Sequence, residues 1–235
     1  MIIKIPYSDY NKANEAPDKI LEAFEQIWSN EDETDKKIDV KESSDYSEKT
    51  IALGGSHVIS YDCIKKFAKK NKNPGLIVFD AHPDVFQEFE TVSYQDWVKH
   101  IVDENIIAKE NIILIGIRNP SVEEIQYLKE NNIKYYTCRQ IFNNLQEICD
   151  AVMELARNFS ALYISVDIDS VDPAFAPGVS HIEPAGLSSR ELIYFLQRIK
   201  RIGNLKAADI VEVVPSKDIN GMTVKLAAKI LKELI

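Results

Sequence analysis

The sequence is poor in cysteine and has no apolar run long enough to cross a membrane. Its three cysteines, Cys63, Cys138 and Cys149, form no CxxC pair, and their odd number favours reduced thiols that pack as small core residues. The N-terminus, MIIKIPYSDY, lacks the longer apolar segment and the cleavage site of a signal peptide. We therefore expect a soluble, cytoplasmic protein without disulfides.

Basic residues are also fewer than acidic ones. Lysine and arginine number 28, against 37 aspartates and glutamates, so the formal net charge is −9. Nucleic acids and anionic membranes bind basic surfaces, and we expect neither as a partner. A cationic small-molecule substrate is compatible with this balance of charge.

No linker, low-complexity tract or internal repeat divides the 235 residues, so we expect one domain over 1–235. Short apolar runs rich in β-formers alternate with longer amphipathic segments. This alternation predicts an α/β protein with three layers, in which helices cover both faces of a mainly parallel sheet. The predicted strands are 2–5, 50–53, 75–80, 112–117, 133–136, 161–167 and 206–212. The predicted helices are 14–29, 57–71, 94–105, 121–131, 139–158, 188–201 and 222–234.

Three titratable residues follow one of the most apolar predicted strands, in the segment LIVFDAHPDVF at 76–86. Asp80, His82 and Asp84 occupy alternate positions, which share one side of an extended chain. Pro83 cannot donate to a strand ladder, so the ladder has ended by this point. The segment is therefore typical of a loop that presents ligands.

Other strand ends carry similar residues. Asp167 and Asp169 end the apolar run in YISVDIDSVDPAFAPG, His57 follows the strand in IALGGSHVIS, and Glu212 follows the strand in ADIVEVVP. Ligands of open α/β sheets bind beyond the carboxyl ends of the strands, so we expect these residues to gather there. Asp172 precedes Pro173 and is better explained as a turn former.

Four aspartates and two histidines at one rim require cations, because crowded ionised carboxylates repel each other in a partly buried site. Two divalent metal ions would balance the four negative charges. A mixture of carboxylate and imidazole suits manganese, iron or zinc, whereas an all-oxygen set favours magnesium or calcium. Two such ions close together can share a water molecule and lower its pKa toward neutrality.

The motifs GGSHVIS, FDAHPDV, SVDIDSVDPAFAPG, EPAGLSSREL and DIVEVVP resemble, in this order, those of the arginase/agmatinase (ureohydrolase) family. The resemblance covers roughly residues 50–235. It implies the arginase-like three-layer fold, two Mn²⁺ ions per subunit, and hydrolysis of a guanidino compound, a linear amidine, to urea and an amine. It also implies a homo-oligomer, either a trimer or a hexamer.

The resemblance further implies a role for each strand-end residue. One manganese would be held by His57, Asp80, Asp84 and Asp167, and the other by His82, Asp80, Asp167 and Asp169, with Asp80 and Asp167 bridging. Asp84 would pass a proton to the leaving amine. Glu212 would pair with the planar, cationic guanidinium, to which a carboxylate can bond through two N–H groups at once.

The chain departs from the family pattern where the family has a histidine at the mouth of the active site, 16–17 residues past the first aspartate of DAHxD. Counting from Asp80 reaches Asp96 and Trp97, and His100 lies one helical turn beyond Asp96. Either Asp96 or His100 could stand in for that histidine, or the chain could have no substitute for it.

Two further departures concern the substrate and the N-terminal segment. The stretch VFQEFETVS is acidic and aromatic where arginases bind the α-carboxylate of arginine, and Ser121 replaces the acid that binds the α-amine, with Glu123 and Glu124 close by. These changes favour agmatine, giving putrescine in polyamine biosynthesis, over arginine. The segment 1–49 is acidic and shorter than its counterpart in the family.

Two alternatives stay open from the sequence. The protein could be an arginase or hydrolyse another guanidino or formimino compound, or it could be a catalytically weak family member that binds metal. The full set of six ligands together with Glu212 favours an enzyme.

Overall fold

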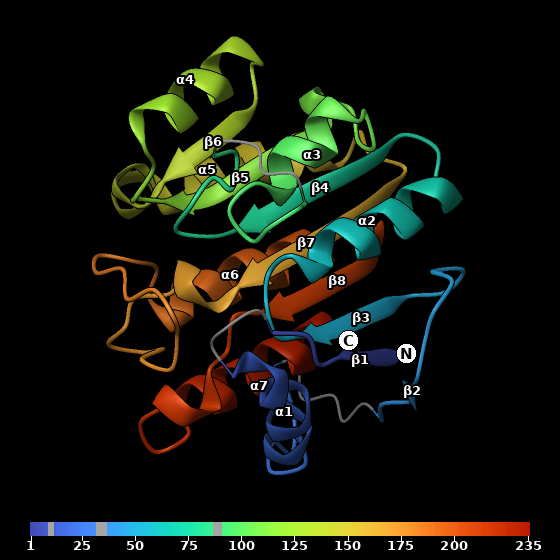
Figure 1. Cartoon of the computed structure of the whole chain (residues 1–235), viewed down its shortest axis with the longest axis vertical. Coiled ribbons are helices and arrows are strands. Elements are labelled where there is room, and N and C mark those ends of the chain that lie inside the picture. The colour runs from blue at the N-terminus through green and yellow to red at the C-terminus, as the bar shows by residue number, and fades with distance from the viewer. Residues whose placement is uncertain (9–11, 32–36, 87–90) are drawn as a thin grey trace.

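The computed structural model describes residues 1–8, 12–31, 37–86 and 91–235, and within them the strands form one sheet. The order of the eight described strands is β2-β1-β3-β8-β7-β4-β5-β6, and every pairing is parallel. The strands are β1 Ile2–Ile5, β2 Val40–Lys41, β3 Thr50–Gly54, β4 Pro74–Phe79, β5 Ile112–Ile117, β6 Lys134–Thr137, β7 Ala161–Asp167 and β8 Leu205–Val211. Figure 1 shows them side by side, with their arrowheads toward the same edge.

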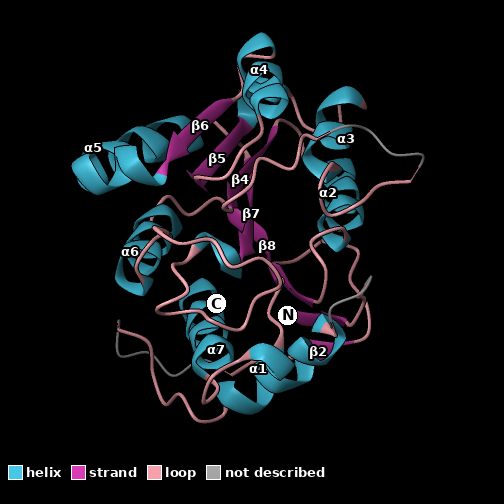
Figure 2. Cartoon of the chain, turned by 60° about the vertical axis from the view of Figure 1, so that its left-hand side comes forward, coloured by secondary structure: helices cyan, strands magenta, loops and turns pink. Residues whose placement is uncertain are grey.

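Helices cover both faces of this sheet, which confirms the predicted three-layer α/β/α fold. They are α1 Ala16–Phe24, α2 Ile59–Lys70, α3 Trp97–Asp103, α4 Val122–Glu130, α5 Cys138–Ala156, α6 Ser189–Lys200 and α7 Met222–Leu234. One hydrophobic cluster joins the sheet to α1, α5, α6 and α7, and a second joins it to α2, α3 and α4. In Figure 2 the sheet is seen nearly edge-on, with α5, α6 and α7 on one side and α2 and α3 on the other.

The central strands show why their apolar runs are uninterrupted. Ile77 and Phe79 of β4 pack in the first cluster, while Leu76 and Val78 pack in the second. Successive side chains of a strand point to opposite faces, so a strand covered on both faces needs an apolar residue at every position. None of the described helices is both long and apolar enough to cross a membrane.

The predicted elements are all present, with differences at their ends. The prediction 94–105 was too long, because α3 begins only at Trp97: the Asp96 carboxylate accepts hydrogen bonds from the backbone N–H and hydroxyl of Ser93 and holds a turn there. The prediction 14–29 was also too long, since α1 ends at Phe24. The edge strand β2 was missed because its two residues are exposed and carry no apolar pattern.

Candidate metal centre

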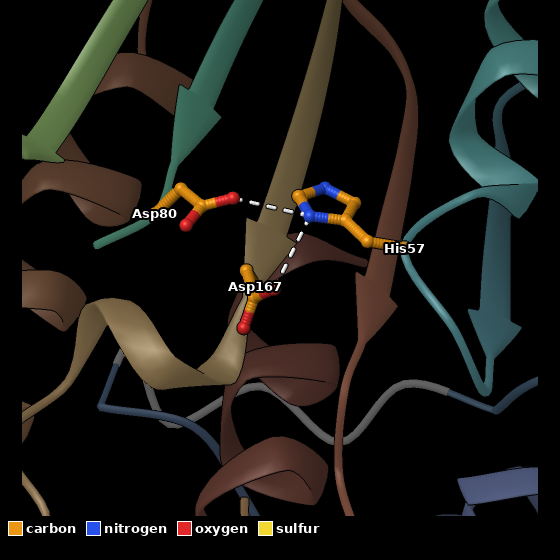
Figure 3. A group of neighbouring side chains, drawn as sticks. All are labelled: His57, Asp80 and Asp167. Atoms are coloured by element: carbon orange, nitrogen blue, oxygen red, sulfur yellow. Dashed lines mark ion pairs between the residues drawn. The ribbon is translucent and has the colours of Figure 1, made fainter. Parts of the chain in front are cut away.

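Three of the predicted ligands meet beyond the carboxyl ends of β3, β4 and β7 (Figure 3). His57 lies between β3 and α2, Asp80 directly follows β4, and Asp167 is the last residue of β7. The Nδ1 atom of His57 lies 3.1 Å from Asp80 Oδ2 and 3.1 Å from Asp167 Oδ2. It also lies 3.3 Å from Asp84 Oδ2. One imidazole nitrogen thus faces three carboxylates.

A second group shares Asp80 with the first. The Nδ1 atom of His82 lies 3.2 Å from Asp169 Oδ2 and 3.5 Å from Asp80 Oδ1. The ligand atoms of His57, Asp80 and Asp167, and likewise those of Asp80, His82 and Asp169, lie within 4.8 Å of one another. Two adjoining groups with a common aspartate are the arrangement that two neighbouring cations would need.

The alternate spacing of the ligands has a local cause in the backbone. Asp80 Oδ1 accepts a hydrogen bond from the N–H of His82 at 2.7 Å, and Asp167 Oδ1 accepts one from the N–H of Asp169 at 2.8 Å. Asp169 in turn accepts from the N–H of Ala81. An aspartate that binds the N–H two residues later folds the chain into a tight turn, so each strand-end carboxylate positions the next ligand.

The buried atoms of the site fit a cation. His57 Nδ1 and Asp80 Oδ2 are fully buried, and although they lie 3.1 Å apart, their geometry forms no hydrogen bond, either with each other or with the rest of the described chain. Buried polar atoms without partners are rare, because each loses its hydration without compensation. Carboxylate oxygens and imidazole nitrogens are the donors that manganese, iron and zinc accept, so the residues present fit the predicted pair of divalent metal ions.

Crowding changes the proton affinity of these groups. Burial, with the nearby charges of Asp169 and Asp80, raises the pKa of Asp167 well above its usual value, and burial beside Asp80 raises the pKa of Asp84 to about 8. Burial opposes a charge on His57, but its carboxylate neighbours outweigh that effect and raise its pKa as well. The metal-free site therefore holds protons that a cation would displace.

Asp84 is fixed by α3. Its φ angle is 53°, in the left-handed region, and its carbonyl oxygen accepts hydrogen bonds from the N–H groups of Val98 and Lys99. The indole N–H of Trp97 donates to Asp84 Oδ2 at 2.7 Å, and the Trp97 ring centroid lies 4.7 Å from that of His57. Trp97 is one of the two residues at the position of the family's mouth histidine. It contacts two of the predicted ligands, Asp84 through a hydrogen bond and His57 through its ring.

Glu212 directly follows β8 and contacts the segment that carries His57. Its Oε1 accepts a hydrogen bond from the backbone N–H of His57 at 2.7 Å, and its own N–H donates to the carbonyl of Gly55. Its φ angle is 61°. Burial raises the pKa of Glu212 to about 7.

A cavity of about 360 Å³ opens above these residues. It is lined by His57, His82, Asp84, Phe86, Tyr94, Gln95, Asn119, Pro120, Ser121, Glu124, Asp167, Asp169, His181, Glu183 and Glu212. No lysine or arginine is among these lining residues. Nearby Arg118 donates its guanidinium N–H groups to the backbone carbonyls of Asp169, Ser170 and Glu183.

Neither Asp96 nor His100, the two candidates for the mouth of the site, lines the cavity. Asp96 is fully buried in its turn with Ser93, and His100 lies beside Asp96 and Glu104, so neither lines the cavity. Residues 87–90 of the stretch VFQEFETVS, like 32–36 of the acidic N-terminal segment, lie outside the described residues.

Sequence reasoning missed a histidine and a glutamate of the loop before α6. His181 stacks on Tyr94 with 5.7 Å between ring centroids and meets His82 edge-on at 5.9 Å. Glu183 Oε1 accepts from the side-chain amide of Asn119 at 2.7 Å and lies 3.3 Å from His82 Nε2. The signals were a histidine in GVSHIEPAG, a stretch without periodicity, and the motif EPAGLSSREL, which begins at Glu183 but was given no site role.

The fold and the strand-end acids define a class of three-layer α/β protein with two groups of potential metal ligands beyond the sheet. The Arginase family model matches residues 3–235, and the chain belongs to the arginase family. It is 35% identical over 188 residues to "Arginase 1, mitochondrial" of Oryza sativa subsp. indica, covering 78% of this chain and 54% of that protein. It is 33% identical to the agmatinase of Bacillus subtilis (strain 168), covering 79% of this chain and 62% of that protein.

Solved structures confirm the predicted arginase-like fold. Formimidoylglutamase from Bacillus subtilis superimposes with a TM-score of 0.88 at 26% identity, covering 99% of this chain and 84% of that one. The agmatine ureohydrolase of Thermoplasma volcanium gives 0.80 at 26% identity, covering 99% and 87%. The chain therefore matches family members whose names give different substrates, while its alignments span between half and two thirds of the two curated relatives above.

Proposed function

We propose that the protein is a metal-dependent hydrolase that cleaves a C–N bond of a guanidino compound, with two Mn²⁺ ions per subunit. The observation that carries this proposal is the pair of ligand groups sharing Asp80, with buried atoms left without hydrogen bonds, directly beneath an acidic cavity. His57, Asp80, Asp84 and Asp167 would hold one ion. His82, Asp80, Asp167 and Asp169 would hold the other. When bound, the ions supply Lewis-acid activation of water.

Glu212 is proposed to bind and orient the guanidinium group. Its carboxyl group lies in the cavity beside His57 and accepts a hydrogen bond from the backbone N–H of His57. A carboxylate accepts two N–H groups of a guanidinium together, which fixes the plane of the group and places its carbon next to the metal ligands. Burial raises the pKa of Glu212 to about 7. The positively charged guanidinium would stabilise the ionised form of this carboxyl group.

Asp84 is proposed as the proton carrier for the leaving amine. An amine departs only when protonated, and the donor must lie within reach of the scissile bond. Asp84 lines the cavity that would hold the guanidino substrate, so its carboxyl group lies within reach of a bond cleaved there. The hydrogen bond from Trp97 holds one oxygen of this carboxyl group in place.

The cavity favours agmatine, which would yield putrescine, as the substrate. Beyond Glu212 and the proposed metal ligands, its titratable lining residues are Tyr94, Glu124, His181 and Glu183, and no lysine or arginine lines it among the described residues. The carboxylates of arginine, or of a formimino derivative of glutamate, would meet no basic lysine or arginine there, whereas an ammonium tail would meet acids. Assembly as a trimer or hexamer and a cytoplasmic location stay predictions.

A substrate panel tests the proposed function. The manganese-loaded protein should release urea from agmatine with a kcat/KM at least tenfold above that for arginine or 4-guanidinobutyrate. Faster turnover of arginine would refute the preference. Manganese occupancy without urea from any guanidine would instead identify a metal-binding protein without ureohydrolase activity.

A pair of matched variants locates the preference within the cavity. Glu183→Gln removes one acid from the lining, and the ratio of kcat/KM for agmatine over arginine should fall by about fivefold, because a partly exposed ion pair contributes about 1 kcal/mol. Glu123→Gln removes an exposed acid next to Glu124 that does not line the cavity, and should leave the ratio unchanged.

A further inference from the structure

A chain of hydrogen bonds runs from His57 into the sheet, away from the cavity. His57 Nε2 lies 2.9 Å from the hydroxyl oxygen of Ser165, which lies 2.6 Å from Asp209 Oδ1. The hydroxyl of Tyr163 donates to Asp209 Oδ2 at 2.7 Å. Ser165, Tyr163 and Asp209 are completely buried, and 1% of His57 is exposed.

Strand register builds this chain. Ser165 of β7 pairs with Asp209 of β8, and Tyr163, Ser165 and Asp167 occupy alternate positions on one face of β7. The same strand therefore presents Asp167 to the proposed metal site and Ser165 to the ring of His57. The hydrogen bonds that hold the buried Asp209 carboxylate thus come from the neutral hydroxyls of Ser165 and Tyr163.

The residue types fix the direction of the chain. An ionised carboxylate only accepts hydrogen bonds, so Ser165 and Tyr163 both donate to Asp209. Burial is the largest influence on Asp209 and raises its pKa. The two hydroxyl donors act in the opposite direction, because they stabilise the ionised carboxylate. Ser165 has a single hydrogen and gives it to Asp209, so toward His57 it can only accept.

The acceptor role of Ser165 determines the tautomer of the His57 imidazole. His57 must carry its hydrogen on Nε2 to donate to Ser165, which leaves the lone pair of the neutral ring on Nδ1. Nδ1 is the nitrogen that faces Asp80, Asp84 and Asp167. A metal ion at this point needs that lone pair, and partners behind a ligating histidine commonly fix its tautomer.

We propose that Asp209 is a positioning residue which, acting through Ser165, holds His57 in the tautomer that presents Nδ1 to a divalent cation. This inference rests on the proposed metal centre. Asparagine at position 209 could donate its amide hydrogens to Ser165, and the serine hydroxyl could then turn and donate to His57 Nε2. The imidazole hydrogen would move to Nδ1, where it blocks the cation.

Manganese titration of the metal-stripped protein tests this role, with bound ions counted by mass spectrometry after dialysis at increasing Mn²⁺ concentration. In Asp209→Asn the affinity of one of the two ions should fall at least tenfold, because loss of such a partner typically weakens metal binding 10–100-fold. Tyr163→Phe removes the other donor to Asp209 but leaves Ser165 in place, so its affinities should stay within threefold of wild type.

Two further measurements separate positioning from a general structural role. Ser165→Ala should weaken the same ion, and the Ser165→Ala/Asp209→Asn double variant should be no weaker than Ser165→Ala, since Asp209 acts through the serine. Metal-free Asp209→Asn should melt no lower than metal-free wild type, because an isosteric neutral amide replaces a buried charge.

The outcomes of the manganese titration distinguish failure of the metal centre from failure of the role of Asp209. Wild-type protein that binds no manganese removes both the metal centre and this inference. Wild-type protein that binds two ions, with Asp209→Asn binding both within threefold as tightly, leaves the centre standing and refutes the role of Asp209. If the losses of Mn²⁺ affinity in the two single variants multiply in the double variant, Asp209 is a structural residue instead. A lower melting temperature of metal-free Asp209→Asn leads to the same conclusion.

Discussion

At the scale of single residues, the site combines several features that disfavour folding. Asp84 and Glu212 both have φ angles in the left-handed region, at 53° and 61°, and both are buried acids. A non-glycine residue in a rarely populated conformation costs about 1–3 kcal/mol, and such residues cluster at functional sites. Both side chains line the same cavity, so both unfavourable conformations fall at the proposed functional site.

Replacing Glu212 tests the guanidinium site. Glu212→Gln keeps an oxygen that can accept from the N–H of His57 but loses the charge that pairs with the substrate. Hydrogen bonds to charged groups contribute about 1.5–3 kcal/mol, so kcat/KM for agmatine should fall about 10- to 100-fold in steady-state assays. Manganese content should stay at two ions per chain. Unchanged kcat/KM would show that another group binds the guanidinium.

The raised pKa values predict how stability depends on pH. In the metal-free protein the pKa of Asp84 is raised to about 8 and that of Glu212 to about 7, so between about pH 4 and pH 8 the folded state binds more protons than the unfolded state. The free energy of unfolding should therefore fall as pH rises through this window. Urea titrations in chelator at pH 5 and pH 8 measure the change.

The control for this prediction is Asp84→Asn, which removes one of the two groups and should flatten the decline. Manganese should also oppose the decline, because the cation takes the place of the protons. A metal-free protein that gains stability steadily from pH 5 to pH 8 would contradict the assignment.

At the scale of elements, the N-terminus of α4 helps to position the site. The hydroxyls of Ser121 and Ser188 accept from the N–H groups of Glu124 and Glu191, and these glutamates bond back to the serine N–H groups, forming capping boxes. Glu124 also accepts from the N–H of Val85, at 3.4 Å. The start of α4 therefore holds the loop that carries Asp84, whereas Glu191 bonds only to Ser188 in the part of the chain that the structure describes.

Two serine variants separate these roles. Ser188→Ala and Ser121→Ala should each lower the free energy of unfolding by about 1 kcal/mol, the usual effect of losing an N-cap, as measured by urea denaturation. Only Ser121→Ala should also lower kcat/KM, because Ser121 lines the cavity and its capping partner Glu124 touches the loop of Asp84. Equal activity losses in both variants would show that the cap at α4 has no special link to the site.

At the scale of the whole molecule, the sheet and the ligand rim could be predicted because both depend on local patterns. Runs such as IILIGI identify strands covered on both faces, and parallel strands bring their carboxyl ends to one edge. The two-residue edge strand β2 could not be predicted, since exposed residues leave no pattern.

The parts of the site that escaped prediction depend on contacts between distant segments. His181 enters the cavity only because its loop returns across the ends of the strands to meet Tyr94 and His82. Asp209 reads as one polar residue in an apolar run, and its meaning emerges only from the register that places it beside Ser165. Pairings of this kind have no signature in the separate segments.

The central claim is that two cations complete this rim, and the manganese content of the protein tests it most directly. Chelator-stripped protein, dialysed against Mn²⁺ and counted by mass spectrometry, should hold two ions per chain, and urea release from agmatine should return with them. A chain that stays metal-free, or binds one ion at most while fully folded, would contradict the account.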